Sequence, residues 1–138
     1  MKIRIKPIYR QKVKYFILGF LALSLGLLIY LLLRPNTHIS RLMLSLFSLD
    51  IPNTYDVIDY PFFKFYLVDY LWAFGFSCWL HCIFIEQRNG ALCSMLIVSF
   101  IGIAYEMMQF FNVVSGTGDV LDCLLYLLAG WTVNTLKI

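Results

Sequence analysis

Residues 15–33 read YFILGFLALSLGLLIYLLL, which is nineteen residues without a charged side chain. A helix needs about 20 predominantly apolar residues to cross the hydrocarbon core of a bilayer, so this stretch predicts a transmembrane helix. Residues 1–14, MKIRIKPIYRQKVK, precede it and hold six Lys or Arg and no acid. A signal peptide has a shorter apolar region that ends in small residues, whereas this one ends in LLLRPN. We therefore expect a retained membrane anchor behind a basic tail.

Three further apolar runs follow, at residues 65–85, 91–111 and 120–136. The whole chain of 138 residues is 61% hydrophobic and 14% charged, against about 45–50% and about 25% in soluble domains. This composition excludes a soluble enzyme, a disordered tail and a secreted disulfide scaffold. The sequence predicts an all-α integral membrane protein, a single membrane domain in which four transmembrane helices form a bundle.

The basic residues predict how the bundle is oriented. If the N-terminus is cytoplasmic, the tail, Arg88 and Lys137 place eight basic residues inside, and three remain outside. Cytoplasmic segments carry the excess of Lys and Arg, so both termini are expected in the cytoplasm of a multi-pass protein. The outer loop, residues 34–64, contains SRLMLSLFSLDIP, where Leu42, Leu46 and Leu49 can share one helical face. We expect an interfacial helix there that lies on the lipid bilayer.

Carboxylates inside the predicted spans are the main candidates for function. Asp69 and Glu106 each lie five residues from the outer end of a span, about 7 Å deep at 1.5 Å per residue, and Asp122 lies about one turn inside the fourth. Ionisable side chains within a membrane usually face the bundle interior or a water-filled cavity. These three residues are the candidate catalytic groups. With Asp119 they form what we call the acidic seam, which is expected to open outward.

Helical spacing gives the acidic seam its neighbours. Ser99, Gly102, Glu106 and Gln109 are three or four residues apart, and so are Asp119, Asp122 and Tyr126. Gln109, Asp119 and Tyr126 are therefore candidate ligand-binding residues. Two structural alternatives stay open: Asp119 can cap the fourth helix, and Asp69 can reach the outer interface. Grouped carboxylates repel one another, so a cation is expected beside them, supplied by Arg34, Arg41, Lys64, a substrate or a partner.

The second half of the chain resembles VanZ-like membrane proteins. The resemblance is carried by Glu106-Met107-Met108-Gln109, a glycine-containing loop, Asp119-Val120-Leu121-Asp122 and a glycine near position 130, with Asp69 matching an acid in an earlier helix. It covers about residues 65–131. Gly116 and Thr117 stand near the family's loop Arg, Tyr126 replaces its Asn, and Tyr70 replaces a Lys. The resemblance implies a bacterial inner-membrane protein of the cell envelope that is linked to teicoplanin resistance.

These observations favour a cell-envelope protein that binds, or acts on, a lipid-linked or cell-wall-related ligand through the acidic seam. One alternative is an accessory subunit of a larger membrane complex or a homo-oligomer, and a less favoured one is a proton or cation pathway. Catalysis is left open. No cofactor or nucleic-acid partner is expected, because the sequence shows no nucleotide-binding loop and no nucleic-acid signature. No metal is expected, because Cys78, His81 and Cys82 on one helix cannot complete a tetrahedral shell. Cys93 and Cys123 also fall inside predicted spans, so no disulfide framework is expected.

Overall fold

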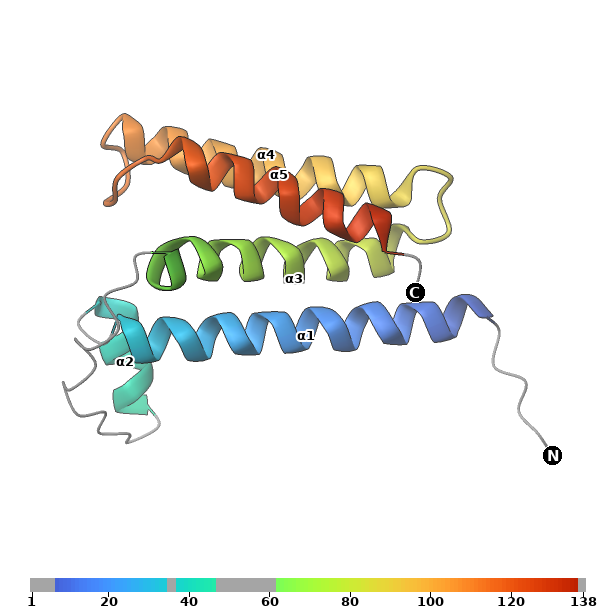
Figure 1. Cartoon of the computed structure of the whole chain (residues 1–138), viewed down its shortest axis with the longest axis horizontal. Coiled ribbons are helices and arrows are strands. Elements are labelled where there is room, and N and C mark those ends of the chain that lie inside the picture. Colours follow the sequence, from blue (N-terminus) through green and yellow to red (C-terminus); the bar gives the residue numbers. More distant parts are fainter. Residues whose placement is uncertain (1–6, 35–36, 47–61, 137–138) are drawn as a thin grey trace.

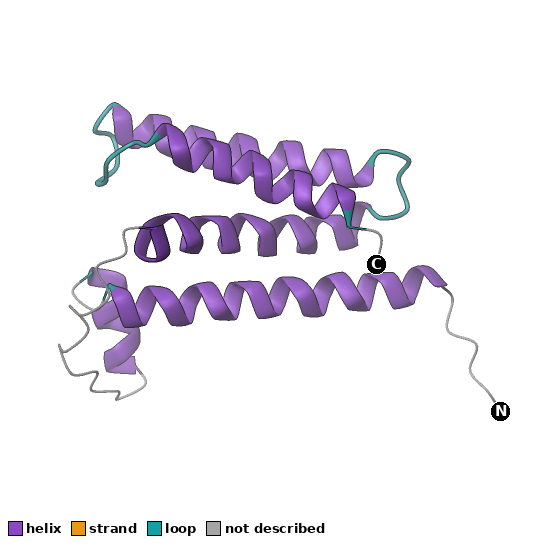
Figure 2. Ribbon diagram, viewed as in Figure 1, coloured by secondary structure: helices purple, strands orange, loops and turns teal. Residues whose placement is uncertain are grey.

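The computed structural model describes residues 7–34, 37–46 and 62–136, and this part of the chain contains helices and loops without strands (Figure 2). The elements are α1 (Pro7–Leu33), α2 (His38–Leu46), a short π-helix η2 (Phe62–Tyr66), α3 (Leu67–Phe84), α4 (Gly90–Phe110) and α5 (Val120–Thr135). Three helices are long and apolar enough to cross a membrane, namely α1, α3 and α4. The helix α5 is also apolar but shorter.

The helix α3 lies in the middle of the molecule. In Figure 1, α1 runs along one side of α3, and α4 and α5 lie together on the other side. The start of α1 and the end of α5 meet at one end of the bundle, where the Tyr15 hydroxyl donates to the Leu136 carbonyl. The Tyr70 hydroxyl, in the first turn of α3, donates to Thr132 Oγ1, in the last turn of α5, at 3.1 Å. The opposite end gathers the end of α1, the start of α3, the end of α4 and the start of α5 (Figure 1).

The helix boundaries follow from local chemistry. The helix α1 begins at Pro7, eight residues before the uncharged run, because a proline fits the first helical position and the charged residues after it are compatible with a helix. It ends at Leu33, two residues before Pro35, which disfavours helical geometry in the residue before it. The residue that follows α4 and its cap, Asn112, has a positive φ of 56°, a conformation that Asn tolerates better than most residues.

The buried core is a small apolar cluster in which α3 contacts the helices on both sides. Its members are Tyr15, Ala22, Ala73, Phe74, Cys78, Val98, Ala129 and Val133. The outward faces of the helices carry large apolar side chains, such as Phe100 with 74% and Leu21 with 58% of its surface exposed. Soluble proteins rarely expose extended apolar faces of this kind. Together with the three long apolar helices, these faces indicate a membrane protein.

The helix α2 follows α1 at the end of the bundle that holds the acidic seam. Thr37 precedes it, and its Oγ1 accepts a hydrogen bond from the Ser40 N–H at 3.2 Å, as an N-cap does. Leu42 and Leu46 expose 57% and 69% of their surfaces, so their face of α2 is available for contact with lipid. Leu49, Asp50, Asp56 and Asp59, which belong to the predicted outer loop, lie outside the described residues.

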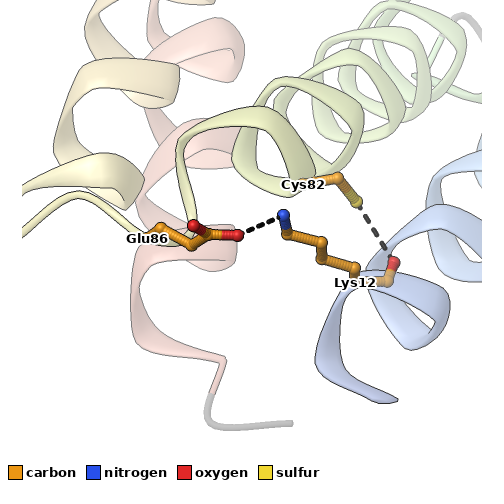
Figure 3. Close-up of polar contacts among 3 residues, drawn as sticks. All are labelled: Lys12, Cys82 and Glu86. Atoms are coloured by element: carbon orange, nitrogen blue, oxygen red, sulfur yellow. Dashed lines mark hydrogen bonds and ion pairs between the residues drawn. The ribbon is translucent and has the colours of Figure 1, made fainter. Parts of the chain in front are cut away.

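An ion pair joins α1 to the α3–α4 loop at the other end of the bundle. Lys12 Nζ lies 2.6 Å from Glu86 Oε1, and the Cys82 Sγ lies 3.3 Å from the Lys12 carbonyl oxygen, to which the thiol points (Figure 3). About a third of the Lys12 side chain and two thirds of the Glu86 side chain are exposed. Ion pairs this exposed contribute little to stability, since water screens the charges.

Replacing Lys12 with alanine is therefore expected to lower the free energy of unfolding by about 0.5 kcal/mol and no more than about 1 kcal/mol. The measurement is reversible unfolding of the purified protein in mild detergent, at low and at high salt. High salt should remove most of the difference between the two proteins, because it screens exposed charges. A loss several times larger, or one that salt leaves unchanged, would contradict this expectation.

Candidate functional site

The four carboxylates of the acidic seam lie at the same end of the bundle and come from three helices. Asp69 is in the first turn of α3, Glu106 is in the last turns of α4, and Asp119 and Asp122 begin α5. Their charges act on one another: Asp69 interacts electrostatically with Asp122 and Glu106, and Asp122 interacts with Glu106 and Asp119. The structure therefore brings the four carboxylates of the acidic seam to one end of the bundle.

Both oxygens of Glu106 have hydrogen-bond partners from α5 and the loop before it. Glu106 Oε2 accepts from the Asp119 N–H at 3.0 Å, and Oε1 accepts from the Tyr126 hydroxyl at 2.9 Å. The side chain is buried, with 6% of its surface exposed. A buried carboxylate with both oxygens occupied holds neighbouring segments in place, so Glu106 fastens the start of α5 to the end of α4.

Both side-chain oxygens of Asp119 also accept hydrogen bonds from the protein. Its Oδ1 accepts from the Leu121 N–H at 2.9 Å, which confirms that Asp119 is the N-cap of α5. Its Oδ2 accepts from the Tyr66 hydroxyl of η2 at 3.0 Å. This hydrogen bond raises the pKa of Tyr66, which precedes the span of α3, because ionised Tyr66 could not donate. Asp119 therefore joins α5 to the start of α3.

Two glycines make this arrangement sterically feasible. The Tyr126 ring packs on Gly102, where an added Cβ would lie 2.6 Å from Cγ and 2.7 Å from Cε2 of the ring. Gly116 in the α4–α5 loop has φ +147°, a conformation that other residues rarely adopt, and the Gln109 side chain packs against it. Gln109 is thus positioned as a support for the loop, next to the carboxylates.

Asp69 and Asp122 differ from the other two acids. Asp122 Oδ1 is buried and has no hydrogen-bond partner among the described residues. Asp69 and Asp122 are affected by burial and by the charges of neighbouring groups. Neither carboxylate accepts a hydrogen bond from a described residue. Both side chains are half-buried. Within the acidic seam, these are the two carboxylates available to a ligand.

Arg34 supplies a positive charge to this end of the bundle. It follows α1 directly, and its charge acts on both Asp69 and Asp122. Its guanidinium carbon lies 4.3 Å from the ring centre of Phe65 and 5.5 Å from that of Tyr30, which are cation–π contacts. Arg34 was one of three basic residues that the sequence offered for this role. Arg41 is exposed on α2, and the Lys64 side chain lies outside the described part of the structure.

Sequence reasoning missed Tyr66 and Phe65 as parts of this site. Both belong to a segment rich in aromatic residues, which predicts a membrane–water interface in general and gives no sign of a specific partner. The spacing of Tyr66 and Asp69, three residues apart, was the available signal, since it places them on neighbouring faces of one helical turn.

Within residues 7–34, 37–46 and 62–136, no group of three or more His, Cys, Asp or Glu side chains is arranged to hold a metal ion. The four cysteines are all in this part of the chain and form no disulfide. Comparison of the chain with protein-family models, curated proteins and solved structures gave no match. The likeness to VanZ-like proteins therefore stays a prediction that rests on the short motifs around Glu106 and Asp122.

Proposed function

We propose that this chain is a multi-pass protein of the bacterial inner membrane that binds a lipid-linked or cell-wall-related ligand at the acidic seam. The observation that carries the proposal is a difference among the four carboxylates: two of them accept hydrogen bonds from the described residues and two do not. Glu106 and Asp119 are occupied by hydrogen bonds that hold the helices together, while Asp69 and Asp122 lack such bonds and lie near Arg34. The ligand-binding centre in this proposal is Asp69, Asp122 and Arg34.

The proposed topology has four spans, formed by α1, α3, α4 and α5, and both termini in the cytoplasm. The distribution of basic residues supports it, because the positive-inside bias places the basic tail, Arg88 and Lys137 on the cytoplasmic side. The start of α1 and the end of α5 lie at one end of the bundle, as four antiparallel spans require (Figure 1). The acidic seam then opens toward the outer leaflet, where lipid-linked envelope intermediates present their polar groups.

Two alternatives receive less support. An accessory subunit was favoured by the absence of a loop arginine, since a partner could bring the positive charge, but Arg34 brings one from within the chain. A proton or cation pathway would need polar groups along the bundle. Below the acidic seam, the buried side chains are apolar ones such as Phe74 and Val133 together with the serines Ser77, Ser94 and Ser99, and no further buried acid of the described residues continues the seam.

The test is binding of a lipid-linked peptidoglycan precursor to the purified protein in mild detergent, measured by native mass spectrometry. Replacement of Asp122 or Asp69 with asparagine should reduce the bound fraction about tenfold, since a charge-assisted hydrogen bond contributes about 1.5–3 kcal/mol. Glu86→Gln is the matched control, because it removes one carboxylate charge at the opposite end of the bundle. It should leave binding unchanged.

The same purification shows whether a second protein copurifies with the chain. A stoichiometric partner that Asp122→Asn releases, without any bound precursor, would favour the accessory-subunit alternative. Equal precursor binding by the wild type, both Asp variants and Glu86→Gln would show that the acidic seam is not the binding site.

A further inference from the structure

The chemistry of Arg34 is the starting point for identifying the ligand. A guanidinium that stacks on an aromatic ring keeps its planar N–H groups at the ring edge, and this planar fork matches phosphate oxygens. Phe65 and Tyr30 hold the guanidinium by cation–π contacts. The Arg34 Nε is buried and has no hydrogen-bond partner among the described residues. Arg34 is thus fixed in position with hydrogen-bonding capacity that the described protein does not use.

At the same end of the bundle, the carboxylate of Asp122 also has an oxygen without a hydrogen-bond partner among the described residues. Asp122 Oδ1 is buried without a hydrogen bond, and the charge of Arg34 acts on Asp122 and Asp69. Among the described residues, Arg34 forms no ion pair with a carboxylate, although it lies at the same end of the bundle as Asp69 and Asp122. Buried polar groups without partners are costly, and a ligand that gave an acceptor to Arg34 and a donor to Asp122 would remove this cost.

The geometry points to a zwitterionic ligand, whose phosphate Arg34 binds and whose primary ammonium Asp122 and Asp69 bind. This inference rests on the proposed function and names the ligand class of that site. An ammonium group has three donors, enough to reach both carboxylates, and a phosphate accepts from the guanidinium fork. A simple anion would leave Asp122 without a donor, and a simple cation would leave Arg34 without an acceptor.

The position of the site in the bundle favours a lipid as the source of this chemistry. Asp69 and Asp122 lie in the first turns of their helices, and Arg34 lies just past the end of α1, so the three charges sit where apolar helices meet the headgroup layer. Phosphoethanolamine carries a primary ammonium two carbons from its phosphate ester. A phosphatidylethanolamine headgroup in the outer leaflet is therefore the ligand that the charges of this site fit.

The experiment measures which lipid stays bound to the protein. Purified protein is incubated with equimolar phosphatidylethanolamine, phosphatidylglycerol and phosphatidylcholine, and the bound lipids are counted by native mass spectrometry. The wild type should retain phosphatidylethanolamine about tenfold over both others, because phosphatidylglycerol lacks the ammonium and phosphatidylcholine lacks its N–H donors. Asp122→Asn should abolish the preference over phosphatidylglycerol. Arg34→Gln should lower retention of both phosphatidylethanolamine and phosphatidylglycerol.

Matched controls are Arg41→Gln, which removes an exposed guanidinium from α2, and Glu86→Gln at the other end of the bundle. Neither should change the order of the three lipids. Arg34→Lys keeps the positive charge but lacks the planar fork, and it should retain less than half of the wild-type phosphatidylethanolamine. This variant provides a second test if Asp122→Asn does not fold. Soluble O-phosphoethanolamine distinguishes the two sources: displacement of the lipid only at millimolar concentration identifies the lipid headgroup, and displacement at micromolar concentration identifies a soluble ligand of the same chemistry.

The inference is overturned if the wild type retains phosphatidylglycerol as well as phosphatidylethanolamine, or if the Asp122 and Arg34 variants match their controls. Failure of the inference and failure of the proposed function give different results. If the peptidoglycan precursor still binds in an Asp122-dependent manner while the three lipids bind equally, the site stands and its ligand is not this zwitterion. If no ligand depends on Asp122 or Arg34, both proposals fail.

Discussion

Replacing Glu106 with alanine is expected to lower the free energy of unfolding by about 3 kcal/mol, because two buried hydrogen bonds are lost and their donors keep no partner. The donors are the Asp119 N–H and the Tyr126 hydroxyl, which meet the two oxygens of one carboxylate. The start of α5 should loosen from α4 at the same time. The measurement is equilibrium unfolding in detergent, together with amide hydrogen exchange at Asp119.

Two variants separate this role from a general effect of mutation. Glu106→Gln keeps a carbonyl oxygen as an acceptor and should cost about 1 kcal/mol. Met107→Ala changes the neighbouring residue, half of whose surface is exposed on the outer face of α4, and should cost less than Glu106→Ala. A Glu106→Ala protein as stable as Met107→Ala, with unchanged exchange at Asp119, is the result that contradicts the fastening role.

Replacing Gly102 with alanine is expected to destabilise the protein by about 2 kcal/mol, although alanine is the better helix former. The added methyl group would lie within 3 Å of several atoms of the Tyr126 ring, which cannot bend away. The ring would have to move, and its hydroxyl would then leave Glu106 Oε1. Unfolding in detergent gives the energy, and fluorine NMR of a single fluorotyrosine placed at position 126 reports the change around this ring.

A double-mutant cycle makes this expectation specific to the ring. In a Tyr126→Ala background the steric conflict is absent, so Gly102→Ala should be neutral or stabilising by up to about 1 kcal/mol. A coupling energy of about 2 kcal/mol between the two positions is the expected result. If Gly102→Ala costs the same in both backgrounds, the close contact between Gly102 and Tyr126 does not explain the loss.

The sequence predicts the helices well because their signal is strong and local. Apolar runs near 20 residues have few alternative interpretations, and the predicted runs 65–85, 91–111 and 120–136 overlap the helices Leu67–Phe84, Gly90–Phe110 and Val120–Thr135. The start of α1 at Pro7 was not predicted from the uncharged run, because charge marks where a helix leaves the hydrocarbon and says nothing about where the helix begins.

The candidate site shows where sequence reasoning stops. Helical spacing brought Glu106, Asp119, Asp122 and Tyr126 together, because three- and four-residue steps fix a face. Helical spacing could not show which of these residues are held by hydrogen bonds within the protein. Glu106 was one of the three candidate catalytic groups, yet both of its side-chain oxygens accept hydrogen bonds from the protein. Hydrogen-bond partners depend on the loop before α5 and on η2, whose conformations a periodicity does not encode.

Glu106 lies close in the sequence to its hydrogen-bond partners, whereas Arg34 lies far in the sequence from Asp69 and Asp122. Glu106 meets Asp119 and Tyr126, so these bonds close within one helical hairpin, with short loops and little loss of chain entropy. In the proposed four-span topology, we expect such a hairpin to form when it enters the bilayer, before α1 associates with it. Arg34 must come from the first helix to reach Asp69 and Asp122. We therefore expect the α4–α5 hairpin to form early and the charge of Arg34 to join the proposed site when α1 docks.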